Sequence, residues 1–163
     1  FGKKTYRQSS GDALYRRSIY TFWRRIAAPT MIFDNADRMT CSVISYRTNT
    51  PLHALNTLNN TTYVEAARLL AGSALKEKST DRETLKKIYQ RILTRLPREK
   101  EIPILLAGLE RDRQQFAANN DNVIAFLGVG DSPVDSSLDP VELASWTNLC
   151  IAVLNLDESL TRQ

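Results

Sequence analysis

The sequence predicts a mainly α-helical protein, an irregular helical bundle with a long ordered loop in its N-terminal part. Apolar residues recur at helical spacing through residues 51–156, and helix-start signals precede several of these runs. The 163 residues contain only six Gly and six Pro, and 42% are of hydrophobic type, as in ordinary globular domains. We therefore expect residues 1–163 to form one domain or a large part of one.

The N-terminal part divides into three stretches. Residues 1–10 are polar and basic, and we expect a frayed end. From Asp12 to Ile26, aromatic and aliphatic residues interleave with arginines at helical spacing, and Pro29 ends this predicted helix. Residues 29–50 have no sustained period, which predicts a long ordered loop, a feature that is uncommon and usually functional or well packed.

Two helices follow the loop. Thr50 can cap a helix and Pro51 suits its first position, so a short helix is predicted from Pro51 to about Leu58. A second helix is predicted from about Thr62 to Lys76. It contains so many alanines and leucines, including Leu69, that we expect it to be largely buried.

A capping box marks the next helix. Thr80 and Glu83 have the required spacing, the apolar stripe reaches Leu96, and Pro97 ends it. Another helix is predicted over 98–119.

The C-terminal part ends in an apolar helix. A short helix over 122–127 and a surface loop over 128–137 come first. Asp139 and Pro140 then cap a helix that runs to Leu156 and is apolar almost all round, Trp146 included, which is typical of a central core helix. No run of about 20 apolar residues predicts a membrane span.

Candidate catalytic residues are few and weak. The sequence has no Gly-rich phosphate loop, HExxH, GxSxG or CxxC motif. Asp34 and Asp37 could bind a cation or act as acid and base, although turn formation and ion pairing are the more common roles of such residues. His53 is the only histidine and could act as acid, base or ligand, but a structural hydrogen-bonding role is more common. Arg47 is the fourth candidate catalytic residue.

The two cysteines predict no metal site. Cys41 and Cys150 are too few to hold a metal by themselves. They permit one disulfide, with two free buried thiols as the favoured alternative, because sequence cannot place the two Cα atoms within bonding range.

The charge is unevenly distributed. Residues 1–50 hold nine Lys/Arg and three Asp/Glu, a net +6, whereas residues 51–163 hold thirteen and fifteen, a net −2. The basic part could attract an anionic partner, and its interleaved rings and guanidinium groups could stack on sugars or bases. The alternatives are internal pairing of the arginines and burial of the rings in the core. A nucleic-acid partner is not expected, because no recognition motif accompanies the basic charge. The candidate binding residues are Arg17, Tyr20, Arg24, Arg38 and Asn49.

Acidic residues follow the last predicted helix. Asp157 could cap a further turn. Alternatively, Asp157 and Glu158 could reach back to Arg38 or Arg47 in the loop and clamp it.

Several stretches together resemble the C-terminal part of the planctomycete PSD1 domain, DUF1553. Coverage begins near residue 14 and continues to the end, and the ordered set is more specific than any one motif. The chain departs from the family pattern at His53, where Gln is usual, at Asn60-Thr61, where Asp-Pro is usual, and at Ser159, where an aromatic is usual. The stretches that carry the resemblance are Arg16–Arg25, Phe33–Arg38, Thr40-Cys41, Arg47–Leu52, Ala54-Leu55, Leu58-Asn59, Val64–Arg68, Leu154–Glu158 and Leu160–Arg162.

The resemblance implies a parent protein that is large, exported and multidomain, periplasmic or secreted, often with a cytochrome c-like domain upstream. Haem c would be held elsewhere in the parent chain, since this segment has no CxxCH motif, and we expect no cofactor here. The family supplies no assigned catalytic residues, and its usual Gln at position 53 weakens a catalytic role for His53.

Two functional hypotheses follow. The leading one is a non-catalytic helical interaction module whose 16–50 segment contacts a neighbouring domain of the same polypeptide or an anionic polysaccharide. The alternative is a hydrolytic enzyme acting on complex polysaccharide, with a site near Asp34, Arg47 and His53.

Overall fold

A computed structural model describes residues 9–16 and 51–160, and all regular structure within these ranges is helical. The mainly α fold class is therefore confirmed, while the predicted loop over 29–50 and residues 1–8 of the predicted frayed end over 1–10 lie outside the described residues. In chain order the elements are the 3₁₀ helix η1 (Gly11–Tyr15) and the α-helices α1 (Pro51–Asn59), α2 (Thr61–Leu75), α3 (Asp81–Leu93), α4 (Glu101–Ala118), α5 (Asn120–Leu127), α6 (Pro140–Leu154) and α7 (Asp157–Leu160).

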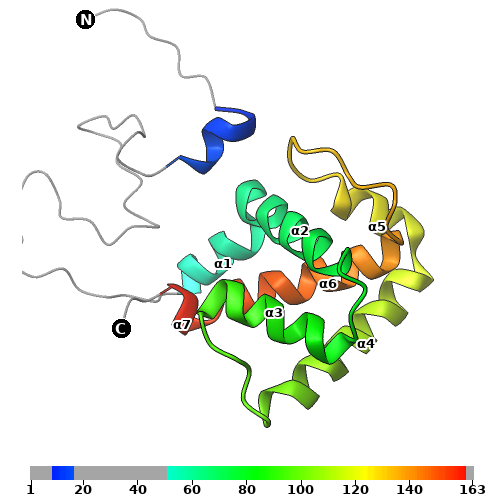
Figure 1. Ribbon diagram of the computed structural model, residues 1–163. Coiled ribbons are helices and arrows are strands. Elements are labelled where there is room, and N and C mark those ends of the chain that lie inside the picture. Colours follow the sequence, from blue (N-terminus) through cyan, green and yellow to red (C-terminus); the bar gives the residue numbers. More distant parts are fainter. Residues whose placement is uncertain (1–8, 17–50, 161–163) are drawn as a thin grey trace, which may run out of the picture.

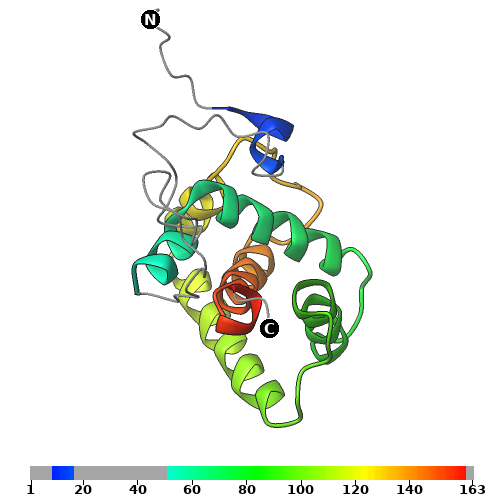
Figure 2. The same ribbon diagram turned by 90° about the vertical axis from the view of Figure 1, so that its left-hand side faces the viewer.

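Helix α6 is the centre of the bundle, as its apolar sequence predicted. It contacts each of the other six described α-helices. In Figure 1 it runs behind α2 and beside α4, and in Figure 2 it is seen nearly end on, surrounded by α2, α3 and α4. Trp146 is 1% exposed, which confirms its predicted core position. A helix that is apolar on nearly every side must have neighbours on nearly every side, and only Pro140, Asn148 and Ala152 of α6 are exposed.

Side-chain caps fix where the helices begin. The Thr80 hydroxyl accepts from the Glu83 amide and the Glu83 carboxylate accepts from the Thr80 amide, so the predicted capping box is present. Asp139 accepts from the amide of Glu142 at the start of α6. Asn60 caps α2 in the same way, by accepting from the Thr62 amide, and it separates α2 from α1.

The prediction that α3 continues to Leu96 is wrong. The helix ends at Leu93, and Thr94 adopts the left-handed conformation at φ 58°. This residue turns the chain, so Leu96 is 58% exposed instead of continuing the buried stripe. Proline 97 therefore lies beyond the end of the helix and does not terminate it.

The prediction of one α-helix starting at Asp12 is also wrong. Residues Gly11–Tyr15 form a single 3₁₀ turn, and Arg16 is already extended, at φ −77° and ψ 151°. The remainder of that predicted helix, residues 17–26, lies outside the described residues.

Helix α2 is buried in a different way from the one predicted. Leu69 is 46% exposed, whereas Glu65 and Arg68 are 1% and 3% exposed. Both charged side chains bond to the loop between α5 and α6, which explains why they and not Leu69 face inward.

Cys150 is a free thiol within α6, fully buried, and burial raises its pKa. Its proposed partner Cys41 lies outside the described residues. For Cys150, a buried free thiol is the state that the sequence analysis favoured over a disulfide.

Candidate functional site

Most residues singled out from the sequence lie outside the described part of the chain. His53 is the exception. It occupies the first turn of α1, is half-buried, and its carbonyl accepts from the Thr57 hydroxyl at 3.2 Å. Whether it converges with the other candidates therefore stays a prediction. Those other candidates are Asp34, Asp37 and Arg47 for catalysis and Arg17, Tyr20, Arg24, Arg38 and Asn49 for binding.

A buried polar site centres on the Glu65 carboxylate, which is 1% exposed. Its Oε2 accepts from the backbone amides of Asp131 and of Ser132, the latter at 3.0 Å. Its Oε1 accepts from the Ser132 hydroxyl at 2.9 Å and from the Tyr15 hydroxyl. One carboxylate of α2 thus joins three segments that are far apart in the sequence. The blue 3₁₀ helix lies beside the α5–α6 loop in Figure 2, as these bonds require.

The hydrogen bonds to Glu65 set the protonation states of the site. The bond from Tyr15, followed by those from Ser132, lowers the pKa of Glu65 to about 2 despite its burial. Burial, followed by the bond to Glu65, raises the pKa of Tyr15 to about 12. At neutral pH the carboxylate is ionised and the phenol is protonated. Neither pKa lies near the operating pH, where a general acid or base is most effective.

Arg68 holds the same loop one helical turn further along α2. Its Nη2 donates to the Ser132 carbonyl at 2.7 Å and its Nη1 to the Pro133 carbonyl at 3.1 Å. Gly130 lets the loop approach Glu65 closely. It adopts φ +100°, and a Cβ there would lie 2.0 Å from Glu65 Oε2. A side chain at this position is therefore incompatible with the site.

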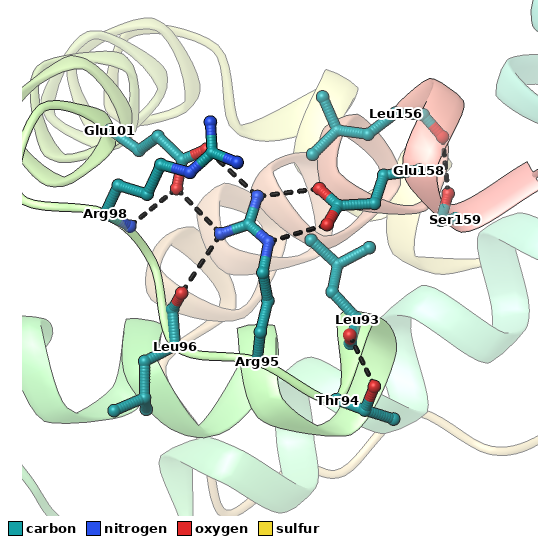
Figure 3. A network of polar contacts seen from close by, with 9 residues as sticks. All are labelled: Leu93, Thr94, Arg95, Leu96, Arg98, Glu101, Leu156, Glu158 and Ser159. Atoms are coloured by element: carbon teal, nitrogen blue, oxygen red, sulfur yellow. Dashed lines mark hydrogen bonds and ion pairs between the residues drawn. The ribbon is translucent and has the colours of Figure 1, made fainter. Parts of the chain in front are cut away.

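A second cluster surrounds Arg95, just after α3 (Figure 3). Its guanidinium forms a two-bond pair with Glu158 at 2.7 Å and 2.7 Å, and another with Glu101 at 3.0 Å and 3.0 Å. It also lies 5.4 Å from the centre of the Tyr89 ring. The bonds from Arg95 lower the pKa of both carboxyl groups. Glu158 therefore pairs with Arg95, and neither Arg38 nor Arg47, its expected partners, is among the described residues.

A third cluster joins three helices through Arg113 of α4. Arg113 donates to Asp81, the first residue of α3, at 2.8 Å and 3.1 Å, and to Glu142 in the first turn of α6 at 2.7 Å and 2.8 Å. Both carboxylates also lie at helix N-termini, where the peptide dipoles favour negative charge. This geometry is suited to holding helices together.

From the sequence, Glu65 and Arg68 were quoted only as part of the resemblance and Glu158 was expected to reach Arg38 or Arg47, so none of these clusters was predicted. One signal was present. Glu65 and Arg68 are charged residues three apart within a helix that is otherwise rich in alanine and leucine, so burial of that helix implied buried partners for them. No comparable signal marked Arg95 or Arg113.

Among residues 9–16 and 51–160, no group of three or more His, Cys, Asp or Glu side chains is arranged to hold a metal ion. In the same ranges no helix has both the length and the apolar character needed to cross a bilayer.

The chain matches a protein-family model. The family model PSD1, described as a protein of unknown function (DUF1553), matches residues 2–109. No curated protein matches, and no solved structure does either. The matched range contains the N-terminal basic part and Glu65, Arg68, Arg95 and Glu101, while Arg113, Ser132 and Glu158 lie beyond it.

Proposed function

The chain belongs to the PSD1 (DUF1553) family, and from that premise we propose that it is a non-catalytic helical interaction module of an exported, haem-associated multidomain protein. Its contact surface is the 16–50 segment. The partner is an anionic polysaccharide or a neighbouring domain of the same polypeptide. Export, haem association and this partner class come from the family resemblance and from the chemistry of the segment.

The partition of charge is the observation that carries the proposal. Residues 1–50 have a net charge of +6, whereas residues 51–163 have −2. In the helical part, several arginines bond to internal carboxylates, with Arg95 and Arg113 as the fullest cases. The net positive charge of the chain is therefore concentrated before Pro51, where it would attract an anionic partner.

Both ends of the segment adjoin structure that contacts the helical bundle. Tyr15 donates to the buried Glu65 carboxylate immediately before it, and α1 begins at Pro51 immediately after it. Attachment at both ends reduces the number of conformations that the segment must lose on binding. This supports its use as a recognition surface of the bundle.

The residue types suit a sulfated or carboxylated glycan. Tyr20 offers a ring face to the apolar side of a sugar, and Arg17 and Arg24 offer guanidinium groups to its anions. Any haem c would belong to another domain of the parent protein, because this sequence contains no CxxCH motif.

Binding to dextran sulfate tests the proposal, with uncharged dextran as the reference ligand. The chain is expected to bind dextran sulfate with an affinity that falls as salt rises. Combining Arg17→Ala with Arg24→Ala is expected to weaken binding at least about tenfold, the loss of roughly 1.4 kcal/mol that one or two charge-assisted contacts supply.

The matched control combines Lys100→Ala with Arg111→Ala, which removes the same charge from two exposed positions of the helical part. Its affinity should stay within about twofold of the unmodified chain, a change of under 0.5 kcal/mol. Equal losses of affinity in the two double variants would show that binding depends only on the net charge of the chain. If the unmodified chain does not bind dextran sulfate, an anionic glycan is rejected as the partner.

A further inference from the structure

A cavity of about 150 Å³ lies between α2, the α5–α6 loop and the first turn of α6. Figure 1 shows that loop, in orange, crossing above the bundle between α5 and α6. A cavity of comparable volume in another protein holds benzene, so the space suits a ligand of about six non-hydrogen atoms. The lining residues are Arg68, Leu69, Gly72, Ser73, Lys76, Pro133, Asp135 and Leu143.

The cavity combines apolar walls with two cations. Leu69, Leu143 and Pro133 supply the walls, and Arg68 and Lys76 supply the charges. Arg68 is 3% exposed, and its Nε–H has no hydrogen-bond partner among the described residues. This Nε–H is enclosed by protein and the Nη groups are bonded to loop carbonyls, so Arg68 contributes its positive charge to the site.

One anion already serves this cavity. Asp135 pairs with Lys76 at 2.6 Å, and this bond, followed by those from Ser137, lowers the pKa of the Asp135 carboxyl. Two cations and one carboxylate leave a net charge of +1 on the lining. The pair with Asp135 also shows that the Lys76 ammonium binds a carboxylate at this position.

We propose that this cavity is a binding site for a short-chain carboxylate, which Arg68 and Lys76 recognise through its anion and the apolar walls through its alkyl part. The ligand carboxylate competes with Asp135 for Lys76. The alkyl part lies over Gly72, where the absence of a side chain leaves room. This site is independent of the 16–50 segment and of the function proposed for it.

Propionate is the probe, and propionamide is its neutral counterpart of the same shape. Propionate added to the ¹⁵N-labelled 163-residue chain at constant ionic strength should give saturable shifts in the amide resonances of Arg68, Lys76 and residues 132–138. Propionamide should bind at least tenfold more weakly. Equal binding of the two compounds, or no saturable shift with propionate in the tens of millimolar, would overturn the proposal.

Three variants separate this site from an unspecific effect, and none changes Arg68, whose Nη groups hold the loop. Asp135→Asn frees Lys76 while keeping an acceptor for Ser137, so propionate should bind at least threefold more tightly. Lys76→Gln should weaken binding at least threefold. Gly72→Ala should also weaken binding, because its added Cβ occupies the cavity at ordinary distances of 3.6 Å and 3.7 Å from Leu138 and Leu143.

The rest of the amide spectrum reports whether each variant keeps the fold. Weaker binding by Asp135→Asn would contradict competition with that carboxylate. Unchanged affinity in Gly72→Ala, with the spectrum otherwise intact, would show that propionate binds elsewhere.

Discussion

At the residue scale, the Glu65 carboxylate is a buried charge whose hydrogen bonds should contribute to stability. It is 1% exposed and accepts four hydrogen bonds from three other residues. A buried charge is tolerated only when it is fully paired, and removal of its charge leaves those donors without a strong acceptor. Its contribution to stability should therefore depend on pH.

Glu65→Gln tests this dependence. The folded pKa of about 2 lies below the ordinary value of 4.5, so the contribution of the carboxylate is present above about pH 4.5 and is lost as the pH falls toward 2. At about 1.4 kcal/mol per unit, the shift corresponds to a contribution on the order of 3 kcal/mol. Urea unfolding at neutral pH should show a loss of about this size in the variant, and the difference from the unmodified chain should shrink near pH 2.

Glu99→Gln is the control for that measurement. Glu99 pairs with Arg82, but its side chain is 80% exposed, so the substitution should change the free energy of unfolding by less than about 1 kcal/mol at either pH. A difference between Glu65→Gln and the unmodified chain that does not vary with pH would exclude ionisation of Glu65 as the source of its stabilisation.

At the element scale, α7 illustrates how a helix too short to be stable alone is kept in place. Four residues cannot offset the cost of helix nucleation. Glu158 in α7 pairs with Arg95, which also holds Glu101 at the start of α4. Arg95 can make both pairs because Thr94 turns the chain at the end of α3. The early end of α3, which the sequence did not predict, therefore positions the side chain that fixes α7.

Arg95→Gln should release α7 without unfolding the bundle. The amide of Leu160, which donates to the Leu156 carbonyl, should exchange with solvent at least about tenfold faster, the effect of a local loss of roughly 1.4 kcal/mol. The amides in the middle of α6 should be unaffected. Hydrogen exchange followed by NMR measures both.

Arg82→Gln provides the matched control, because it removes another arginine–glutamate pair, with side chains 50% and 80% exposed, at a distance from α7 in the sequence. It should leave the exchange of α7 unchanged. If Arg95→Gln also leaves α7 exchange unchanged, packing alone fixes this helix.

At the scale of the whole molecule, the bundle is organised around one helix. Because α6 contacts the other six described α-helices, a loss of packing in α6 weakens the packing of all of them. Within the described residues, Arg95 and Arg113 pair with carboxylates in the first turns of other helices. We therefore expect the helical part to unfold as a single cooperative unit.

Leu149→Ala tests this expectation. Leu149 is 4% exposed in α6, and its truncation should lower the free energy of unfolding by about 2–5 kcal/mol through lost burial and the cavity that remains. Far- and near-ultraviolet circular dichroism should give the same unfolding midpoint. Ile104→Ala, at a position 70% exposed on α4, should change the free energy by less than about 0.5 kcal/mol. Separate midpoints by the two probes would show that the bundle contains independent parts.

The sequence by itself determined the fold class, the central position of α6 and the starts of α1, α3 and α6. These features depend on local chemistry: the period of apolar residues, Pro51 at a first helical position, and the caps at Thr80 and Asp139. The described residues do not test the catalytic hypothesis for His53 or the candidate sites in residues 17–50.

Only the tertiary structure decided which charged residues are buried and where α3 ends. Glu65 and Arg68 face inward because a loop more than 60 residues away presents amides and carbonyls to them. Thr94 ends α3, and Arg95 beside it meets Glu158, 63 residues further along. Such partners come together only when the chain folds, so no local sequence pattern reports them.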